Sequence, residues 1–243
     1  QTCALPILVT GGLGYIGSHT TVELIKNNFE VVIVDNLSNS EFFILENIKQ
    51  ITGVSPKFYN LDLLDFKKFD QIVKENKIHG IIHFAAFKSV SESVLHPVKY
   101  YENNIISLLN VLRAMNLNGI SNLVFSSSCT VYGQPDTLPV SEDSPFKMAE
   151  SPYAYSKQVS ENIIKDVSSS SDKLNAISLR YFNPVGAHSS GLIGELPLGV
   201  PDNLVPYITQ TAAGIREELS VFGNDYTTKD GTAIKIGRAH VWT

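Results

Sequence analysis

The sequence has little of what marks membrane, secreted or nucleic-acid-binding proteins. No apolar run approaches the roughly 20 residues that a membrane-spanning helix needs. Cysteine occurs only at Cys3 and Cys129, which excludes a disulfide scaffold and favours the reducing cytoplasm. Lysine and arginine number 19 against 24 acidic residues, a net charge of -5, and no basic stripe is present. We therefore expect a cytoplasmic protein whose partner is neither a membrane nor a nucleic acid.

What is present is enough apolar material for a packed core. Hydrophobic residues make up 43% and charged residues 18% of the 243 residues, which is typical of a globular chain. A chain of this length suits one large domain, or one domain with a smaller lobe.

The two ends share an unusual relation. Residues 1–7 can be encoded by a DNA sequence whose reverse complement, read from its second base, encodes residues 236–241. The two bases left over are TG, with which the codon of Trp242 begins. We therefore expect residues 1–7 and 236–243 to be translated sequencing adapter, and leave them out of the fold prediction.

Short apolar runs alternate with amphipathic stretches along the rest of the chain. Predicted strands cover 8–10, 31–35, 58–60, 78–84, 123–127 and 176–181. Predicted helices run from the glycine turn to about 27 and over 66–75, 98–115 and 153–167, with a loop at 168–171. This alternation predicts an α/β fold, a Rossmann-type doubly wound parallel sheet wrapped by helices on both faces, over residues 8–181. Residues 182–235, with a helix at 204–215 and a candidate strand at 219–222, predict a smaller substrate lobe that is incomplete.

Three glycines, Gly11, Gly14 and Gly17, lie between the first predicted strand and the following helix. Glycine allows a tight turn and a close approach of the main chain to a pyrophosphate, and the helix N-terminus offers free N–H groups. Asp35 lies 18 residues after Gly17, where an acid receives the ribose hydroxyls of NAD. Its charge would repel the 2'-phosphate of NADP, so we predict NAD as the cofactor. The alternative is a glycine turn that only packs a helix on a strand.

A serine, a tyrosine and a lysine form the candidate catalytic set. Ser128 follows a predicted strand, and the carboxyl ends of parallel strands face the ligand crevice. Tyr153 and Lys157 are four residues apart on a predicted helix and so share one face. Oxidation of an alcohol requires a base, and the Lys157 ammonium with a positive nicotinamide could lower the tyrosine pKa from about 10 toward 7. We predict that Tyr153 takes the proton while Ser128 holds and relays it; the alternative is an ordinary surface pair.

No metal site is predicted. His79 and His83 are four residues apart in or beside a predicted strand. That spacing separates them by about 13 Å, which is too far for two ligands of one metal ion.

The chain resembles the UDP-glucose 4-epimerases, which are extended short-chain dehydrogenases/reductases. The resemblance rests on VTGGLGYIGSHT, VDNLSNS, IHFAAFKSVSESV, YYENN, FSSSCTVYG, SPYAYSK, RYFNPVGAH, PDNLVPY and FGNDY, which together span nearly all of residues 8–234. RYFNPVGAH with FGNDY is specific to the epimerases rather than to the superfamily.

The resemblance implies a role for each matching residue. The implied cofactor-binding residues are Gly11, Gly14, Tyr15, Ile16, Gly17, Asp35, Asn36, Asn39, Ser40, Asp62, Leu63, Phe84, Ala85, Ala86, Lys88, Asn103, Tyr153, Lys157 and Phe182. Catalysis is assigned to Ser128, Tyr153 and Lys157. The implied residues for the UDP-sugar are Lys88, Ser128, Tyr153, Asn183, Asn203, Leu204 and Phe222.

The implied activity is the interconversion of UDP-glucose and UDP-galactose, an isomerase reaction of galactose metabolism. Tightly bound NAD oxidises C4 of the sugar and then reduces it from the other face. The family commonly forms homodimers through helices corresponding to 98–115 and 153–167.

Two alternative functions compete with the epimerase. One is a 4,6-dehydratase, another nucleotide-sugar enzyme of this fold, which would carry an acidic pair after the catalytic serine; Cys129-Thr130 follow Ser128 instead, which favours the epimerase. Cys129 replaces the family's alanine, and a buried inert thiol is expected there. The family also continues for about a hundred further residues, so the chain is expected to be a fragment. As a fragment it could be an inactive NAD-binding module.

Overall fold

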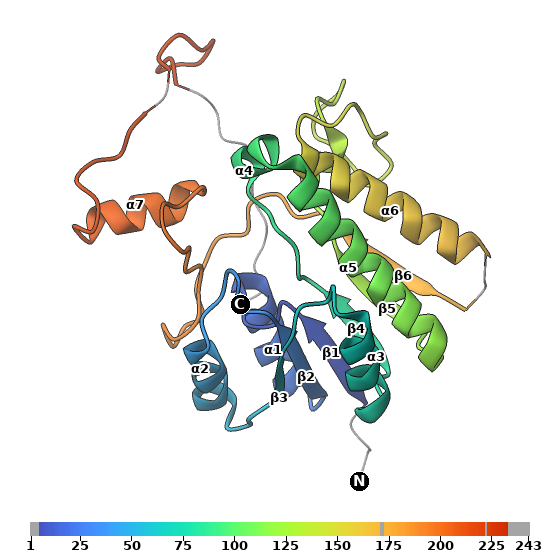
Figure 1. Cartoon of the computed structure of the whole chain (residues 1–243). Coiled ribbons are helices and arrows are strands. Elements are labelled where there is room, and N and C mark those ends of the chain that lie inside the picture. The colour runs from blue at the N-terminus through green and yellow to red at the C-terminus, as the bar shows by residue number, and fades with distance from the viewer. Residues whose placement is uncertain (1–4, 171–172, 222, 233–243) are drawn as a thin grey trace.

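Six parallel strands form one sheet at the centre of the molecule (Figure 1). The computed structural model describes residues 5–170, 173–221 and 223–232. The strands are β1 (Pro6–Thr10), β2 (Glu30–Asp35), β3 (Lys57–Asn60), β4 (Gly80–His83), β5 (Asn122–Ser126) and β6 (Asn175–Leu179). Their spatial order is β3-β2-β1-β4-β5-β6. The chain adds β2 and β3 on one side of β1, then crosses back and adds β4, β5 and β6 on the other side. This order confirms the predicted Rossmann-type sheet.

Helices connect the strands. They are α1 (Tyr15–Lys26), α2 (Phe43–Thr52), α3 (Phe66–Glu75), α4 (Val90–Leu95), α5 (Pro97–Asn118), the short 3-10 helix η1 (Cys129–Tyr132), α6 (Pro152–Ser170) and α7 (Leu204–Ala212). None of the helices among the described residues is long and apolar enough to cross a membrane.

Alternate residues of the central strands enter two separate cores. Leu8 of β1 packs in the core beneath α3, α5 and α6, with Leu108 and Phe125 among its members. Val9, the next residue, packs in the core beneath α1 and α2, with Ile33. Because successive side chains of a strand point to opposite faces, a strand buried on both sides is apolar at nearly every position. The runs at 8–9 and 31–34 follow this rule.

Helices wrap both faces of the sheet as predicted, with α1 and α2 on one face and α3, α5 and α6 on the other, but within the described part of the chain β5 and β6 are covered on one face alone. On the face beneath α1 and α2, no helix of the described residues covers the outer end of the sheet. Ile177 and Leu179 of β6 accordingly remain 60% and 36% exposed. The connections through α5 and α6 both lie on the other face, side by side.

Several predicted boundaries move. Residues 168–170 continue α6 instead of forming a loop, and residues 171–172 lie outside the described part. The predicted strand at 219–222 is absent over 219–221, where Val221 is 67% exposed and pairs with no strand among the described residues; residue 222 is not described. The predicted helix at 204–215 ends at Ala212.

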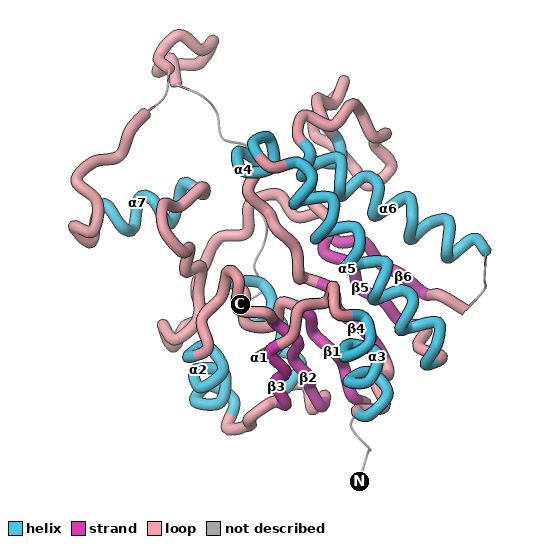
Figure 2. The backbone as a smooth tube through the Cα atoms, in the orientation of Figure 1, coloured by secondary structure: helices cyan, strands magenta, loops and turns pink. Residues whose placement is uncertain are grey.

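The segment after β6 leaves the sheet as a long irregular loop that leads to α7, which stands apart from the other helices (Figure 2). Within this loop Ala187 pairs with Gly194 in an antiparallel bridge. Ile193 between them is 2% exposed and packs in the core beneath α1 and α2. Ile193 therefore anchors the loop in the core of the sheet domain.

Candidate active site

A cleft of about 690 Å³ runs along the carboxyl ends of the strands and under the loop after β6. Every residue predicted to bind the cofactor lines this cleft. Of those predicted for the sugar nucleotide, Lys88, Ser128, Tyr153, Asn183 and Asn203 line it as well. Leu204, the first residue of α7, does not, and Phe222 lies outside the described residues.

The glycine turn closes tightly enough that side chains are excluded. Gly11 has a φ of +66°, and a Cβ at Gly17 would lie 2.1 Å from the carbonyl oxygen of Gly11. Gly14 begins α1 without a capping side chain, so the first N–H groups of the helix stay available at the cleft. An N-terminus of this kind favours a bound anion such as a phosphate.

Asp35 is held in one orientation at the end of β2. One carboxylate oxygen accepts hydrogen bonds from the Leu37 amide at 3.0 Å and the Ser40 hydroxyl at 2.9 Å. The other accepts from the Leu13 amide at 3.1 Å. A carboxylate offers about four acceptor positions, so the second oxygen keeps one for a ligand hydroxyl.

The structure distinguishes the three consecutive serines 126–128 at the end of β5. The Ser126 carbonyl accepts from the Lys157 ammonium at 2.7 Å. The Ser127 hydroxyl donates to the Glu161 carboxylate, away from the ligand. The Ser128 hydroxyl, which lines the cleft, is engaged by neither contact.

Ser128 is oriented by a residue that the sequence analysis did not single out. The Thr130 hydroxyl and amide donate to the Ser128 oxygen at 3.0 and 3.3 Å. With both lone pairs engaged, the Ser128 hydroxyl can only donate to a ligand. A serine followed two residues later by a threonine in a turn is a weak sequence signal for this arrangement.

Tyr153 and Lys157 lie one turn apart on α6, and the Lys157 nitrogen is 5.9 Å from the centre of the Tyr153 ring. Burial lowers the pKa of Lys157 to about 8, although the Glu161 charge opposes this. Burial also raises the pKa of Tyr153 above its usual value, while the neighbouring Ser128 hydroxyl lowers it. Desolvation of the phenolate thus outweighs the Ser128 hydrogen bond, and the joint effect of Lys157 and the nicotinamide on the tyrosine pKa stays a prediction.

Behind the catalytic turn lies an ion pair. The Arg180 guanidinium donates to both Glu161 oxygens, with the shortest contact at 2.8 Å, and to the Tyr132 hydroxyl at 3.0 Å. These hydrogen bonds raise the pKa of Arg180, so it stays charged. The pair ties strand β6 and the Ser127 loop to the helix that carries Tyr153.

His83 is a structural residue of the sheet. Its Nδ1 lies 2.8 Å from the Thr10 hydroxyl, and its ring stacks on Phe125. Burial lowers the His83 pKa to about 3, so the ring is neutral. Among the described residues no cluster of three metal-ligating side chains occurs.

Glu195 is a second residue that sequence reasoning missed. Its carboxylate enters the cleft from the loop after β6, near Lys88, Asn203 and Tyr15. Glutamate in a glycine- and proline-rich segment gives no periodic or spacing signal, so only the structure brings it into view.

A parallel sheet in this order, a glycine turn at the first helix and a Ser-Tyr-Lys set in one cleft define the class of NAD-dependent short-chain dehydrogenases/reductases. The model of the family described as GDP-mannose 4,6 dehydratase matches residues 8–238. The UDP-glucose 4-epimerase of Bacillus subtilis is 51% identical over 95% of this chain and 68% of its own length. That of Dictyostelium discoideum is 51% identical over 94% of this chain and 66% of its own length. The chain belongs to the UDP-glucose 4-epimerase family.

Solved structures give the same relation. A UDP-glucose 4-epimerase from Stenotrophomonas maltophila with bound NAD and formylated UDP-arabinopyranose superposes with a TM-score of 0.90 at 48% identity, over 94% of this chain and 68% of the other. The Bifidobacterium longum enzyme in complex with NAD+ and UDP has a TM-score of 0.90 at 45% identity, over 93% of this chain and 68% of the other. The chain thus spans about two thirds of the length of these relatives.

Proposed function

We propose that this chain binds NAD in the cleft and, with the sugar of UDP-glucose or UDP-galactose beside it, interconverts the two by transient oxidation at C4. The observation that supports this most directly is that one cleft unites the glycine turn, Asp35 and the set Ser128, Tyr153 and Lys157. The first two suit a dinucleotide, and the set suits a secondary alcohol.

The residues fit NAD. The turn has no room for a Cβ at Gly17 and leaves the α1 amides open to a pyrophosphate, while one Asp35 oxygen keeps an acceptor position for a ribose hydroxyl. When bound, NAD supplies a hydride acceptor at the sugar carbon and a positive charge that lowers the pKa of a nearby phenol.

The side chains divide the proton chemistry between them. The Tyr153 phenol oxygen takes the proton of the sugar hydroxyl and later returns it. The Ser128 hydroxyl, whose oxygen already accepts two hydrogen bonds, donates to the sugar oxygen or to the phenolate. Lys157 is fixed by the Ser126 carbonyl, and its positive charge favours the phenolate below pH 8.

The proposal also covers the domains, the oligomeric state and the location of the protein. Residues 8–181 form the NAD-binding domain, and residues 182–235 belong to a partial substrate lobe that brings Asn183 and Asn203 to the sugar nucleotide. Exposed apolar side chains on α5 and α6, including Ile106 and Leu109, support a homodimer through these helices. The reducing cytoplasm remains the proposed location.

A 4,6-dehydratase is the nearest competing activity, since the matched family model bears that description. That chemistry needs an acid beside the catalytic serine. Here Cys129 and Thr130 follow Ser128, and the nearby Glu161 is engaged by Arg180 and Ser127. Epimerisation is therefore favoured.

The test is incubation of the NAD-loaded chain with UDP-galactose, followed by separation of the sugar nucleotides. UDP-glucose should form while no free NADH accumulates. Tyr153→Phe should reduce the rate about 100-fold or more. Tyr155→Phe, a matched control two residues along the same helix and 52% exposed, should leave it unchanged.

Each competing function gives a different result. Stoichiometric NADH release would indicate a dehydrogenase, and a 4-keto-6-deoxy product would indicate a dehydratase. Retention of NAD without any turnover would identify an NAD-binding module.

A further inference from the structure

The loop after β6 carries a short hairpin that delivers Glu195 into the cleft. The His188 amide donates to the Ile193 carbonyl at 2.9 Å, and Ile193 is buried beneath α1 and α2. Two hydrogen bonds between the loop and the sheet domain reinforce this anchor. The Tyr15 hydroxyl donates to the Gly186 carbonyl at 2.7 Å, and the Asn47 amide donates to the Leu192 carbonyl at 2.7 Å. Glu195 thus lies two residues after the buried anchor Ile193.

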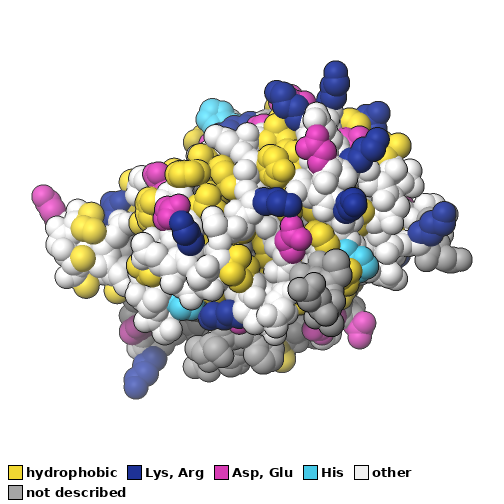
Figure 3. Space-filling model, turned by 90° about the horizontal axis from the view of Figure 1, so that it is seen from below, with side chains coloured by type: hydrophobic (Ala, Val, Ile, Leu, Met, Phe, Trp, Pro, Cys, Tyr) yellow, Lys and Arg dark blue, Asp and Glu magenta, His cyan; other side chains and the backbone are white. Residues whose placement is uncertain are grey.

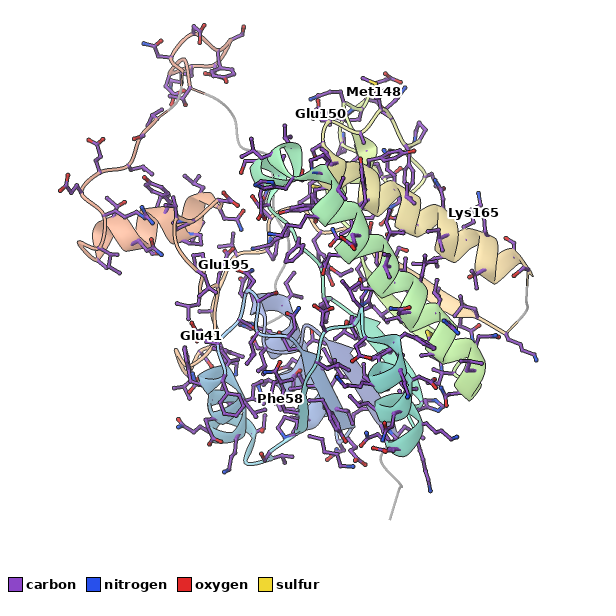
Figure 4. All side chains as sticks on the ribbon, viewed as in Figure 1. Glu41, Phe58, Met148, Glu150, Lys165 and Glu195 are labelled. Carbon is purple, nitrogen blue, oxygen red and sulfur yellow. The ribbon has the colours of Figure 1, made fainter. Side chains whose placement is uncertain are left out.

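The Glu195 carboxylate joins both halves of the cleft. Figure 4 labels Glu195 on the loop after β6. One oxygen accepts from the Lys88 ammonium at 3.3 Å, and Lys88 belongs to the sheet domain. The same oxygen accepts from the Asn203 side-chain amide at 2.5 Å, just before α7. Its side chain is 12% exposed, whereas that of Lys88 is 56% exposed. The negative charge also contributes, after burial, to a Tyr15 pKa raised to about 12.

We propose that Glu195 is a positioning residue that braces Lys88 and Asn203 across the cleft, so that a nucleoside diphosphate meets both donors already in place. The inference rests on the proposed function and assigns part of its specificity to a residue outside the catalytic set.

Donor counting supports this assignment. An ammonium has three N–H donors and a side-chain amide has two, and Glu195 engages one of each. Two Lys88 donors and one Asn203 donor therefore remain for a ligand whose acceptor atoms reach both halves of the cleft. A lysine side chain is otherwise costly to order, because it has four rotatable bonds. With Glu195 present, part of that ordering precedes binding.

The first experiment needs no ligand. A carbodiimide that condenses adjacent lysine and carboxylate groups should join Lys88 to Glu195, detected by peptide mass spectrometry. The pair Lys99 and Glu92, 2.6 Å apart with 47% and 37% exposed side chains, is the internal control. Formation of the control product without the Lys88–Glu195 product would overturn the brace.

The second experiment is a double-mutant cycle with UDP as the probe. UDP is titrated calorimetrically into the NAD-saturated chain and into Glu195→Ala, Lys88→Met and the double variant. Glu195→Ala should weaken UDP binding about tenfold in the unmodified chain, and by a smaller factor in the Lys88→Met background, where only Asn203 is left for Glu195 to hold. Glu195→Gln keeps an acceptor oxygen and should recover part of the loss. Thermal unfolding midpoints should stay close to that of the unmodified chain, because neither side chain belongs to a core.

The two experiments separate this inference from the proposed function. Tighter UDP binding by Glu195→Ala would show that the carboxylate competes with the ligand, and multiplicative losses in the double variant would show independent roles; either overturns the brace. A chain that cross-links but binds no UDP overturns the proposed substrate and the ligand assigned here. A chain that binds UDP but fails to cross-link overturns the brace alone.

Discussion

Burial sets the protonation of the residues around Tyr153. His83 and Lys157 both have lowered pKa values, because their charged forms are poorly solvated beside Phe125. The Lys157 charge further lowers the pKa of His83, so the histidine stays neutral beneath it. Tyr153, the candidate base, therefore has Lys157 as a neighbouring cation, while His83 beneath it carries no charge.

The buried lysine should make stability depend on pH. Lys157 is 4% exposed, and its pKa falls from 10.5 to about 8 on folding. Between these values the unfolded chain still binds a proton that the folded chain has released, so the free energy of unfolding rises with pH. The stability of the unmodified chain minus that of Lys157→Met should therefore grow by roughly 2 kcal/mol from pH 7 to pH 10.

Urea denaturation at fixed ionic strength measures this difference. Lys165→Met, on the same helix but at its exposed surface (Figure 4), is the control and should give a much smaller change. A difference that stays constant, or that falls with rising pH, would contradict the assignment to Lys157.

Gly17 should not tolerate even one added carbon. In Gly17→Ala the Cβ would lie 2.1 Å from the Gly11 carbonyl oxygen, so the turn must open. We expect NADH affinity, followed by fluorescence, to fall at least about 100-fold, since the pyrophosphate and helix amides would no longer align. Thr20→Ala, on the same helix but away from the turn, should bind normally. Equal losses in both variants would point to a general effect on α1.

At the scale of elements, the sequence predicted best those features that repeat or have a fixed spacing. Helix α3 falls at the predicted residues, and Gly11 and Gly14 lie between β1 and α1 as expected, while Gly17 is the third residue of α1. Helix α2 was not predicted, because its N-cap is Phe42, which lacks a capping side chain. Helix α4 has only six residues, too few to show a period. Ser128 was predicted from its place after a strand, but its hydrogen bonds to Thr130, and the engagement of the neighbouring Ser127 by Glu161, are visible only in the structure.

The Glu161–Arg180 pair should be a major support of the catalytic turn. Its side chains are 8% and 20% exposed, so either partner left alone would be a poorly solvated charge. Arg180→Met should cost about 3–5 kcal/mol of unfolding free energy. Glu161→Met combined with Arg180→Met should recover most of it, as measured by denaturant titration. A double variant less stable than Arg180→Met would contradict this account.

At the scale of the molecule, the surface differs between regions. On the face shown in Figure 3, positive and negative side chains are interspersed. Along α5, by contrast, Val98, Ile106, Leu109 and Leu117 are 40–73% exposed. These four side chains form an apolar stripe along α5, and an exposed apolar surface of this kind is typical of one that meets a partner.

Leu109→Glu tests whether a second copy covers this stripe. If α5 and α6 form a dimer interface, light scattering should give twice the chain mass for the unmodified protein and one chain mass for the variant, because a buried carboxylate is strongly unfavourable. Lys67→Glu, on α3 and outside the stripe, should leave the mass unchanged. Equal masses for Leu109→Glu and the unmodified chain would exclude an interface at this position.

The strand order also has a consequence for biosynthesis. β1 lies between β2 and β4, and His83 of β4 follows its neighbour Thr10 by 73 positions. At roughly 5–20 residues per second, about 4–15 s pass before the ribosome has made the partner of one edge of β1. During that interval a nascent β1–β2–β3 unit presents unpaired amides and apolar side chains. Chaperone capture of the emerging chain should therefore peak before β4 leaves the exit tunnel and decline after it.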